Sequence, residues 1–189
     1  MSDTRETLVN LAENAMRTRG YGGFSYADIA RDAGIRKASI HHHFPTKADL
    51  GLAVLDRYAD QVSRQLDAID QQSRLGGQAL LGAIEMYRAA TGSGQALCLC
   101  TALAGDSELV CDDMREMLTR ANSMVSQWIE QTLLKGRRDM SIAVSGDPAI
   151  EAVAILAQLQ GAQLLARAAG DMDQFDRAVS TIAARVSRR

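Results

Sequence analysis

The chain has 189 residues, 47% of them hydrophobic, and a formal net charge of −2. This length suits one domain or a small module joined to a larger one, and the apolar content is sufficient for a packed core. The charge excludes a global basic field, so nucleic acid could be bound only by a local basic patch.

Targeting and redox features are those of a cytoplasmic protein. The N-terminus lacks the apolar core of a signal peptide, and no uninterrupted apolar run approaches the ~20 residues of a membrane span. Three cysteines, an odd number, do not make the disulfide framework of a secreted protein. We therefore expect a cytoplasmic location, no membrane association and reduced thiols.

The composition favours helices. Only two prolines occur, at Pro45 and Pro148, and Ala, Leu, Arg, Gln, Glu and Met are plentiful. No alternating β-branched run has the length of a strand. The sequence predicts an all-α protein with about nine helices.

The N-terminal segment predicts a long helix followed by a short one. Residues 4–19 carry apolar side chains at three- and four-residue spacing, and the glycines of residues 20–23 end this helix. Ser25 and Asp28 form a capping box that begins a second helix. Gly34 stops it after about two turns.

A third short helix and a long fourth helix follow. Ile35 and Ile40 are apolar between polar neighbours, so the third helix is expected to bury one narrow side before Pro45 ends it. Thr46 and Asp49 form a second capping box, with a long amphipathic run behind it.

The remaining chain predicts five further helices, apolar enough to form a core. Residues 74–77 and 91–94 are glycine-rich breaks, and Asp147 is the expected N-cap of the eighth helix. The expected helices cover residues 78–90, 97–104, 107–134, 148–169 and 171–189.

Three adjacent histidines, His41, His42 and His43, raise the question of a metal site. Successive helical residues are rotated by ~100°, so the three imidazoles cannot converge on one ion. No catalytic triad, paired acid site or phosphate loop is visible. We expect no metal, no cofactor and no enzymatic activity.

A short helix, a glycine turn and a second helix with polar outer residues is the helix-turn-helix arrangement. Residues 20–50, GYGGFSYADIARDAGIRKASIHHHFPTKADL, resemble the DNA-binding domain of the TetR family of transcriptional repressors. The resemblance implies a helix-turn-helix DNA-binding domain over residues 1–46 and a ligand-binding and dimerisation domain over residues 47–189.

The resemblance also implies which residues contact DNA. Residues of the third helix are candidates for base-edge and phosphate contact, Lys47 is placed to meet a phosphate, and residues at two helix starts add phosphate contacts. The expected DNA-binding residues are Ser25, Tyr26, Arg36, Lys37, Ala38, Ser39, His41, His42, Thr46 and Lys47.

Individual positions leave alternatives open. Arg36 either reaches the DNA backbone or is simply solvated. His41 stands where the family usually has tyrosine, so the contact geometry there is open. His43 matches a family position whose implied role is packing between the third and fourth helices.

Residues 151–169 are too apolar, and too rich in small side chains, to have a free solvent side, and they resemble the dimer helix of one TetR-family branch. Paired with residues 173–186, they would build a four-helix interface across a two-fold axis, unless the helix is buried inside one subunit. The expected interface residues are Ala152, Ile155, Leu156, Leu159, Gln163, Ala166, Phe175, Val179 and Ile182.

A small-molecule inducer is implied by the family, and its pocket is expected among the fifth to eighth helices. Each candidate also suits a plain core position. The candidates are Met86, Tyr87, Leu99, Leu103, Met117, Met124, Trp128, Leu156 and Gln160.

The cysteines suggest a possible sensor. Cys98 and Cys100 diverge by ~200° on a helix, and Cys111 lies near a helix start, which favours a thiolate. Sensing of oxidants or electrophiles and a buried structural role are both open.

Together these features predict a homodimeric repressor that binds a palindromic double-stranded operator and is released by a small molecule. The alternative is a helical small-molecule-binding or dimerisation protein that no longer binds DNA. His41 in place of tyrosine is the support for that alternative.

Overall fold

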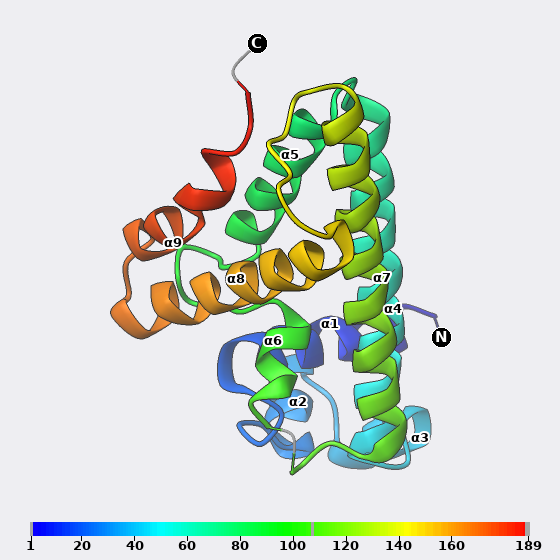
Figure 1. Ribbon diagram of the computed structural model, residues 1–189. Helices are drawn as coiled ribbons and strands as arrows, with labels where there is room; N and C mark the ends of the chain where they lie inside the picture. The colour runs from blue at the N-terminus through cyan, green and yellow to red at the C-terminus, as the bar shows by residue number, and fades with distance from the viewer. Residues whose placement is uncertain (1, 107, 188–189) are drawn as a thin grey trace. The chain divides into compact units, whose positions relative to one another are not determined.

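The structure is built from α-helices. The computed structural model describes residues 2–106 and 108–187, and these contain nine helices and no β-strand (Figure 1). In chain order they are α1 (Ser2–Arg19), α2 (Tyr26–Ala33), α3 (Lys37–His43), α4 (Lys47–Gln72), α5 (Gly76–Ala89), α6 (Leu99–Ala104), α7 (Asp112–Arg138), α8 (Pro148–Ala169) and α9 (Asp173–Ala183). The all-α prediction is confirmed.

Both predicted capping boxes are formed. The Ser25 hydroxyl donates to Asp28 Oδ2 at 2.8 Å, and the Asp28 backbone N–H donates to the Ser25 hydroxyl oxygen at 3.4 Å. At the start of α4, the Thr46 hydroxyl donates to Asp49 Oδ2 at 2.8 Å and accepts from the Asp49 N–H at 3.1 Å. Gly34 ends α2 with φ +68°, a left-handed conformation that glycine adopts without strain.

Helix α5 begins at Gly76, so the predicted break over residues 74–77 was placed too late. A Cβ on Gly76 would lie 2.3 Å from the backbone nitrogen of Gly136, and one on Gly77 would lie 2.9 Å from the Ser141 carbonyl oxygen. These glycines allow two backbones to approach closely, and they do not end a helix.

Two other helices differ at their ends. Helix α6 begins at Leu99, two residues later than predicted. Helix α7 begins at Asp112 and continues to Arg138 instead of ending at Leu134. The predicted start, Ser107, lies outside the described residues, and residues 108–111, also predicted to be helical, are not helical.

The prediction that the last helix reaches residue 189 was wrong within the described residues, because α9 ends at Ala183. The chain beyond it pairs with the segment after α7. The Ser187 N–H donates to the Ser141 carbonyl and the Ala143 N–H donates to the Arg185 carbonyl, both at 2.9 Å. An isolated antiparallel bridge forms there between Ile142 and Val186.

Helix α8 has the predicted ends. Asp147 Oδ1 accepts from the Ala149 N–H at 2.9 Å, Pro148 occupies the first turn, and Gly170 closes the helix with φ +63°. By length and a mean hydropathy of 1.4, α8 could cross a membrane, which qualifies the expectation that no segment could. One such helix is weak evidence, since a core helix of a soluble protein passes the same test.

The chain divides into two compact units that do not follow the predicted boundary at residues 46 and 47. The N-terminal unit comprises Met1–Asp60 and Leu99–Ala121, and the C-terminal unit comprises Gln61–Cys98 and Asn122–Arg189. Helices α4 and α7 are continuous through both units. Helix α6 and the start of α7 therefore belong with the helix-turn-helix.

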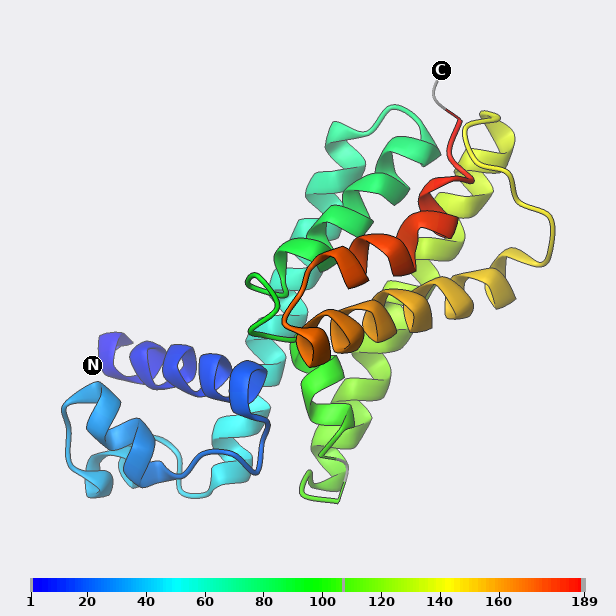
Figure 2. The same cartoon turned by 90° about the vertical axis from the view of Figure 1, so that its left-hand side faces the viewer.

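The N-terminal unit has one hydrophobic core. Figure 2 shows α1, α2 and α3 in blue, with the first turns of α4 in cyan. Side chains from α1, α2, α3, α4 and α6 meet in this core and are fully buried. Examples from each helix are Leu8, Ile29, Ile40, Leu50 and Leu103.

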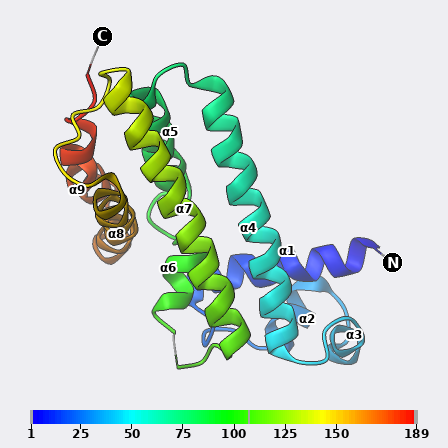
Figure 3. The same cartoon turned by 45° about the vertical axis from the view of Figure 1, so that its right-hand side comes forward.

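In the C-terminal unit α8 packs most extensively against α9, and the two lie side by side in Figure 3. Gln163 of α8 is fully buried. Its Nε2 donates to the Tyr87 carbonyl at 2.7 Å, and its Oε1 accepts from the Cys98 N–H at 3.1 Å. This amide ties α5 and the segment before α6 to α8.

Candidate DNA-binding site

Helices α2 and α3 form the predicted helix-turn-helix. Ile29 and Ala30 of α2 are buried, and so is Ile40 of α3, so each short helix has an apolar side in the core. The hydrogen bonds from Ser25 lower the pKa of Asp28 from 3.8 to about 2, so the capping carboxylate stays ionised further into the acid range than a free aspartate.

The outer side of α3 is exposed. Its buried anchor is Ile40, with an exposed fraction of 0%. Arg36 precedes the helix without a side-chain cap hydrogen bond. The exposed residues in and beside the helix are Arg36, Lys37, Ala38, Ser39, His41 and His42.

The three histidines occupy different surroundings. His41 Nδ1 lies 3.1 Å from the Pro45 carbonyl oxygen, and its ring packs edge-on against Tyr26 with centroids 4.9 Å apart. Because a carbonyl only accepts, Nδ1 carries the proton in this contact, and Nε2 is left for other partners. His43 is half-buried, and its ring lies 5.6 Å from that of His42.

Within residues 2–106 and 108–187, no group of three or more His, Cys, Asp or Glu side chains is arranged to hold a metal ion.

Tyr26 is used inside the protein. Its hydroxyl donates to the Phe44 carbonyl at 2.9 Å and also contacts the Thr46 carbonyl, so it joins α2 to the turn before α4. Burial, with added effects of Asp49 and Tyr21, raises the pKa of Tyr26 to about 12. The hydroxyl expected to reach a phosphate is therefore committed to two backbone carbonyls.

Lys47 also points inward. Its Nζ donates to the carbonyl oxygens of Tyr21 and Phe24, both at 2.6 Å. The same ammonium lies 4.6 Å from the centre of the Tyr21 ring and 4.2 Å from that of Phe24. Burial lowers the pKa of Lys47, against an opposite effect of Asp106 and Asp28. In this structure Lys47 binds the chain's own backbone.

Sequence reasoning missed Asp106, which lies just after α6. Its Oδ2 accepts from the Tyr21 N–H at 2.5 Å and from the Gly22 N–H at 3.3 Å. These contacts bridge 84 and 85 positions of sequence, so no local spacing could have indicated them.

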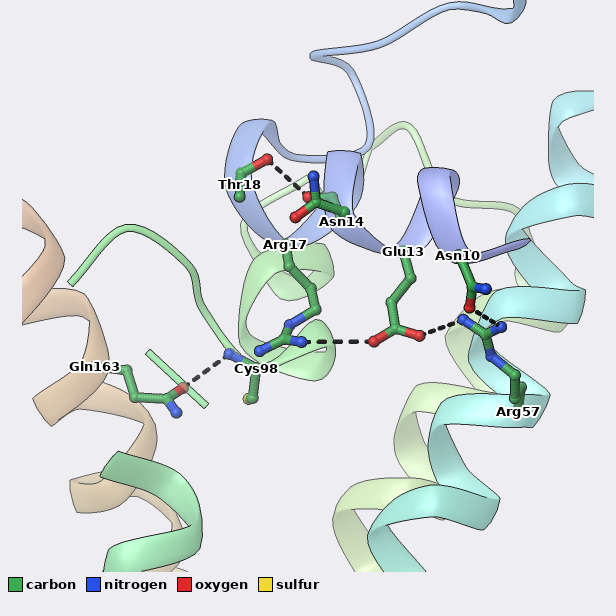
Figure 4. Close-up of polar contacts among 8 residues, drawn as sticks. All are labelled: Asn10, Glu13, Asn14, Arg17, Thr18, Arg57, Cys98 and Gln163. Atoms are coloured by element: carbon green, nitrogen blue, oxygen red, sulfur yellow. Dashed lines mark hydrogen bonds and ion pairs between the residues drawn. The ribbon is translucent and has the colours of Figure 1, made fainter. Parts of the chain in front are cut away.

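Sequence reasoning also missed Arg57 of α4. Its guanidinium donates to Asn10 Oδ1 at 2.5 Å and to Glu13 Oε2 at 2.6 Å, while Glu13 pairs with Arg17 at 3.5 Å (Figure 4). This network fixes α1 against α4, whose N-terminal end follows the helix-turn-helix.

The residues predicted for an inducer pocket are divided between the two units. Leu99 and Leu103 lie in the core of the N-terminal unit, and Met117 packs against that core. The other six belong to the C-terminal unit. Two of these have polar partners there, since Trp128 Nε1 donates to Asp70 at 2.9 Å and Gln160 donates to Asn122 at 3.0 Å.

The cysteines form no disulfide with one another. Cys98 is buried, whereas Cys100 and Cys111 are half-buried and pack against the core of the N-terminal unit.

The predicted dimer-interface residues of α8 and α9 face the interior of the C-terminal unit. All nine are buried within the single chain, at 7% exposure or less, because they form the packing between α8, α9 and the rest of the C-terminal unit. The opposite side of α8 is exposed and apolar. It consists of Ile150, Val153, Ala154, Ala157, Leu164, Leu165 and Ala168.

Comparison with known proteins agrees with this geometry. The family model described as "Bacterial regulatory proteins, tetR family" matches residues 8–54. The repressor NemR of Escherichia coli K12 is 24% identical over 95% of this chain and 92% of its own length. The regulator CymR of Pseudomonas putida is 35% identical over 33% of this chain and 31% of its own length.

Solved structures extend the likeness over nearly the whole chain. A TetR-family transcriptional regulator from Agrobacterium tumefaciens has a TM-score of 0.93 and 25% identity, covering 98% of both chains. The reduced form of E. coli NemR has a TM-score of 0.83 and 23% identity, covering 99% of this chain and 98% of its own.

Proposed function

Because the chain belongs to the TetR family of transcriptional regulators, we propose that it is a repressor that binds a palindromic operator as a homodimer and releases it when a small molecule binds. The observation that carries this proposal is the outer side of α3, which exposes Lys37, Ser39, His41 and His42 around the buried Ile40. A short helix anchored on one side and polar on the other suits the major groove.

The proposed contacts follow from side-chain chemistry. Lys37, at the start of α3, suits a backbone phosphate, Ser39 suits any base edge, and Ala38 suits the thymine methyl group. His41 and His42 add ring nitrogens on the same exposed side.

Phosphate contacts are proposed at the exposed helix starts. Arg36, Ser25 and Thr46 lie there, and the backbone amides of a helix N-terminus favour an anion. We place neither Tyr26 nor Lys47 among the contacts, since both side chains point into the protein, whereas the capping residues Ser25 and Thr46 are exposed.

The homodimer is supported by the exposed apolar side of α8. Ile150, Val153 and Leu165 are 70%, 60% and 56% exposed, and a soluble protein rarely leaves such a stripe in water. A two-fold axis through it would present two copies of α3 to half-sites in successive major grooves, which predicts a palindromic operator.

The inducer-binding region is proposed in the C-terminal unit. Among the residues expected to line it, Met86, Tyr87, Met124, Trp128, Leu156 and Gln160 belong to this unit. A ligand that binds better to the DNA-free arrangement would shift the population toward it and release the operator. The protein would act in the cytoplasm, by binding alone.

Salt dependence of operator binding tests the proposal. The native chain is expected to shift a promoter fragment from beside its own gene, with affinity that falls steeply as salt rises. Lys37→Ala is expected to weaken binding and to reduce the slope of log affinity against log salt by up to about 1.8, for two phosphate contacts in a dimer. Fluorescence anisotropy at several KCl concentrations measures both quantities.

The matched control is Lys135→Ala. Lys135 lies in the last turn of α7, in the C-terminal unit, so its replacement is expected to leave the salt slope of operator binding unchanged. No salt-sensitive binding by the native chain at micromolar concentration would favour the alternative function, a helical ligand-binding or dimerisation protein that no longer binds DNA.

We also propose that oxidants or electrophiles act as inducers by modifying the cysteines. Oxidation of Cys100 or Cys111 would add polar volume beside the core of the N-terminal unit. Treatment with a quinone or an oxidant is expected to weaken operator binding by about 5- to 150-fold, the usual range of allosteric coupling.

Serine replacements of Cys98, Cys100 and Cys111, singly and together, provide the control for this prediction. The variant that lacks the sensing thiol is expected to keep its affinity under oxidant. Unchanged binding by the native chain under the same treatment would remove sensing from the proposed function.

A further inference from the structure

We propose that Lys47 and Asp106 are positioning residues of the DNA-binding surface, which hold the residue 20–24 turn from two sides and do not themselves contact DNA. This inference rests on the proposed operator binding. It assigns roles that differ from the expected phosphate contact by Lys47, and it adds a residue from outside the helix-turn-helix.

The turn is shaped to receive Asp106. Gly20 has φ +81°, and a Cβ there would lie 2.6 Å from Asp106 Oδ2. A Cβ on Gly22 would lie 2.8 Å from a methyl carbon of Leu109. A larger residue at Gly20 would displace the Asp106 carboxylate from its place at the turn, and one at Gly22 would displace the Leu109 side chain.

A single peptide group joins the two charged side chains. The peptide unit between Tyr21 and Gly22 offers its carbonyl oxygen to Lys47 Nζ at 2.6 Å and its N–H to Asp106 Oδ2 at 3.3 Å. A cation at the oxygen and an anion at the hydrogen both favour the same polarisation of this peptide, so the two contacts strengthen each other.

Lys47 has little capacity left for DNA. An ammonium has three N–H donors, and two of them are directed to the carbonyls of Tyr21 and Phe24. The same ammonium also lies over the aromatic rings of Tyr21 and Phe24, which attract a cation. At most one N–H donor of Lys47 is therefore left for a phosphate.

Lys47 and Asp106, together called the clamp, hold the turn that directly precedes α2. Phe24, one of its carbonyl partners, directly precedes Ser25, the N-cap of α2. Because α2 packs against α3, a fixed turn fixes the direction from which α3 is presented. Displacement of the segment that carries Asp106 would loosen this turn, which gives α6 a route to influence DNA binding.

Salt dependence separates a positioning role from phosphate contact. Lys47→Met, which keeps chain length without charge, is expected to weaken operator binding at least about tenfold, the effect of losing a hydrogen bond to a charged group. Its salt slope should equal that of the native chain. The matched variant Lys37→Ala is expected to lower the slope. A slope lowered by about 1.8 in Lys47→Met would overturn the assignment.

Asp106 is tested by two variants of similar size. Removing a negative charge near DNA should strengthen binding if only electrostatics mattered. We expect instead that Asp106→Leu binds at least about tenfold more weakly and that Asp106→Asn, which keeps an acceptor oxygen, stays within about threefold of the native chain. Native or tighter binding by Asp106→Leu contradicts the positioning role.

Hydrogen exchange tests the clamp without DNA. The backbone amides of Tyr21 and Gly22 are expected to exchange at least about tenfold faster in Asp106→Leu than in the native chain, since each loses its acceptor. If the native chain binds no operator, the proposed function fails while exchange still decides whether the clamp holds the turn. If Asp106→Leu does not fold, the positioning role is tested with Lys47→Met alone. Its salt slope should equal that of the native chain, and its Tyr21 and Gly22 amides should exchange faster than in the native chain.

Discussion

The double variant Val153→Glu, Leu164→Glu is expected to be a folded monomer that binds the operator at least about 100-fold more weakly than the native chain. Val153 and Leu164 are 60% and 50% exposed on the outer side of α8, so charge there does not disturb the core of one subunit. In a two-fold interface each carboxylate would be buried without a partner, which costs several kcal/mol per ion.

The loss of affinity follows from the loss of avidity. Linking two half-site contacts in one dimer raises overall affinity by about 10²- to 10⁴-fold over a single contact. Size-exclusion chromatography with light scattering measures the oligomeric state, and anisotropy measures operator binding.

Leu81→Glu is the matched control, because Leu81 is also exposed, at 43%, but belongs to α5 and is not part of this stripe of α8. It is expected to remain dimeric with native affinity. A double variant that stays dimeric, or a native chain that is monomeric at micromolar concentration, would exclude the outer side of α8 as the interface.

Phe175→Ala is expected to reduce the free energy of unfolding by about 3–5 kcal/mol. Phe175 is fully buried on α9, the helix that packs against α8, so truncation leaves a cavity that rigid helices cannot fill. With a urea dependence of about 2 kcal/mol per molar, the unfolding midpoint should fall by about 2 M.

Phe175→Leu is the control, since it keeps most of the buried volume and should cost much less. Denaturation is compared at one fixed protein concentration, because dimerisation adds to apparent stability. A Phe175→Ala variant that is as stable as the native chain but monomeric would instead restore Phe175 to the dimer interface.

In these two predictions the residues that the sequence analysis assigned to the dimer interface are core residues, and the opposite side of α8 forms the interface. Helix α8 is apolar on nearly all sides, so its hydrophobic pattern has no polar stripe to mark the solvent. The residues that the sequence analysis assigned to the interface are buried in the chain's own core. Only packing against α5 and α9 distinguishes the inner side from the outer one.

Lys47 shows a second limit of sequence reasoning. The family pattern correctly placed it at the start of α4, where a phosphate contact is reasonable. Its actual partners are the carbonyls of Tyr21 and Phe24, more than 20 residues earlier in the chain. Backbone acceptors have no sequence signature, and the fold alone brings them to the ammonium.

The sequence by itself determined the all-helical class, the helix-turn-helix, and the caps at Ser25, Thr46 and Asp147. Each of these depends on hydrogen bonds or apolar spacing within a few residues, which composition and order encode directly. The tertiary structure decided which side of α8 is exposed, and it brought Asp106 and Lys47 to the same turn. Those outcomes depend on contacts between distant segments, whose geometry no local pattern contains.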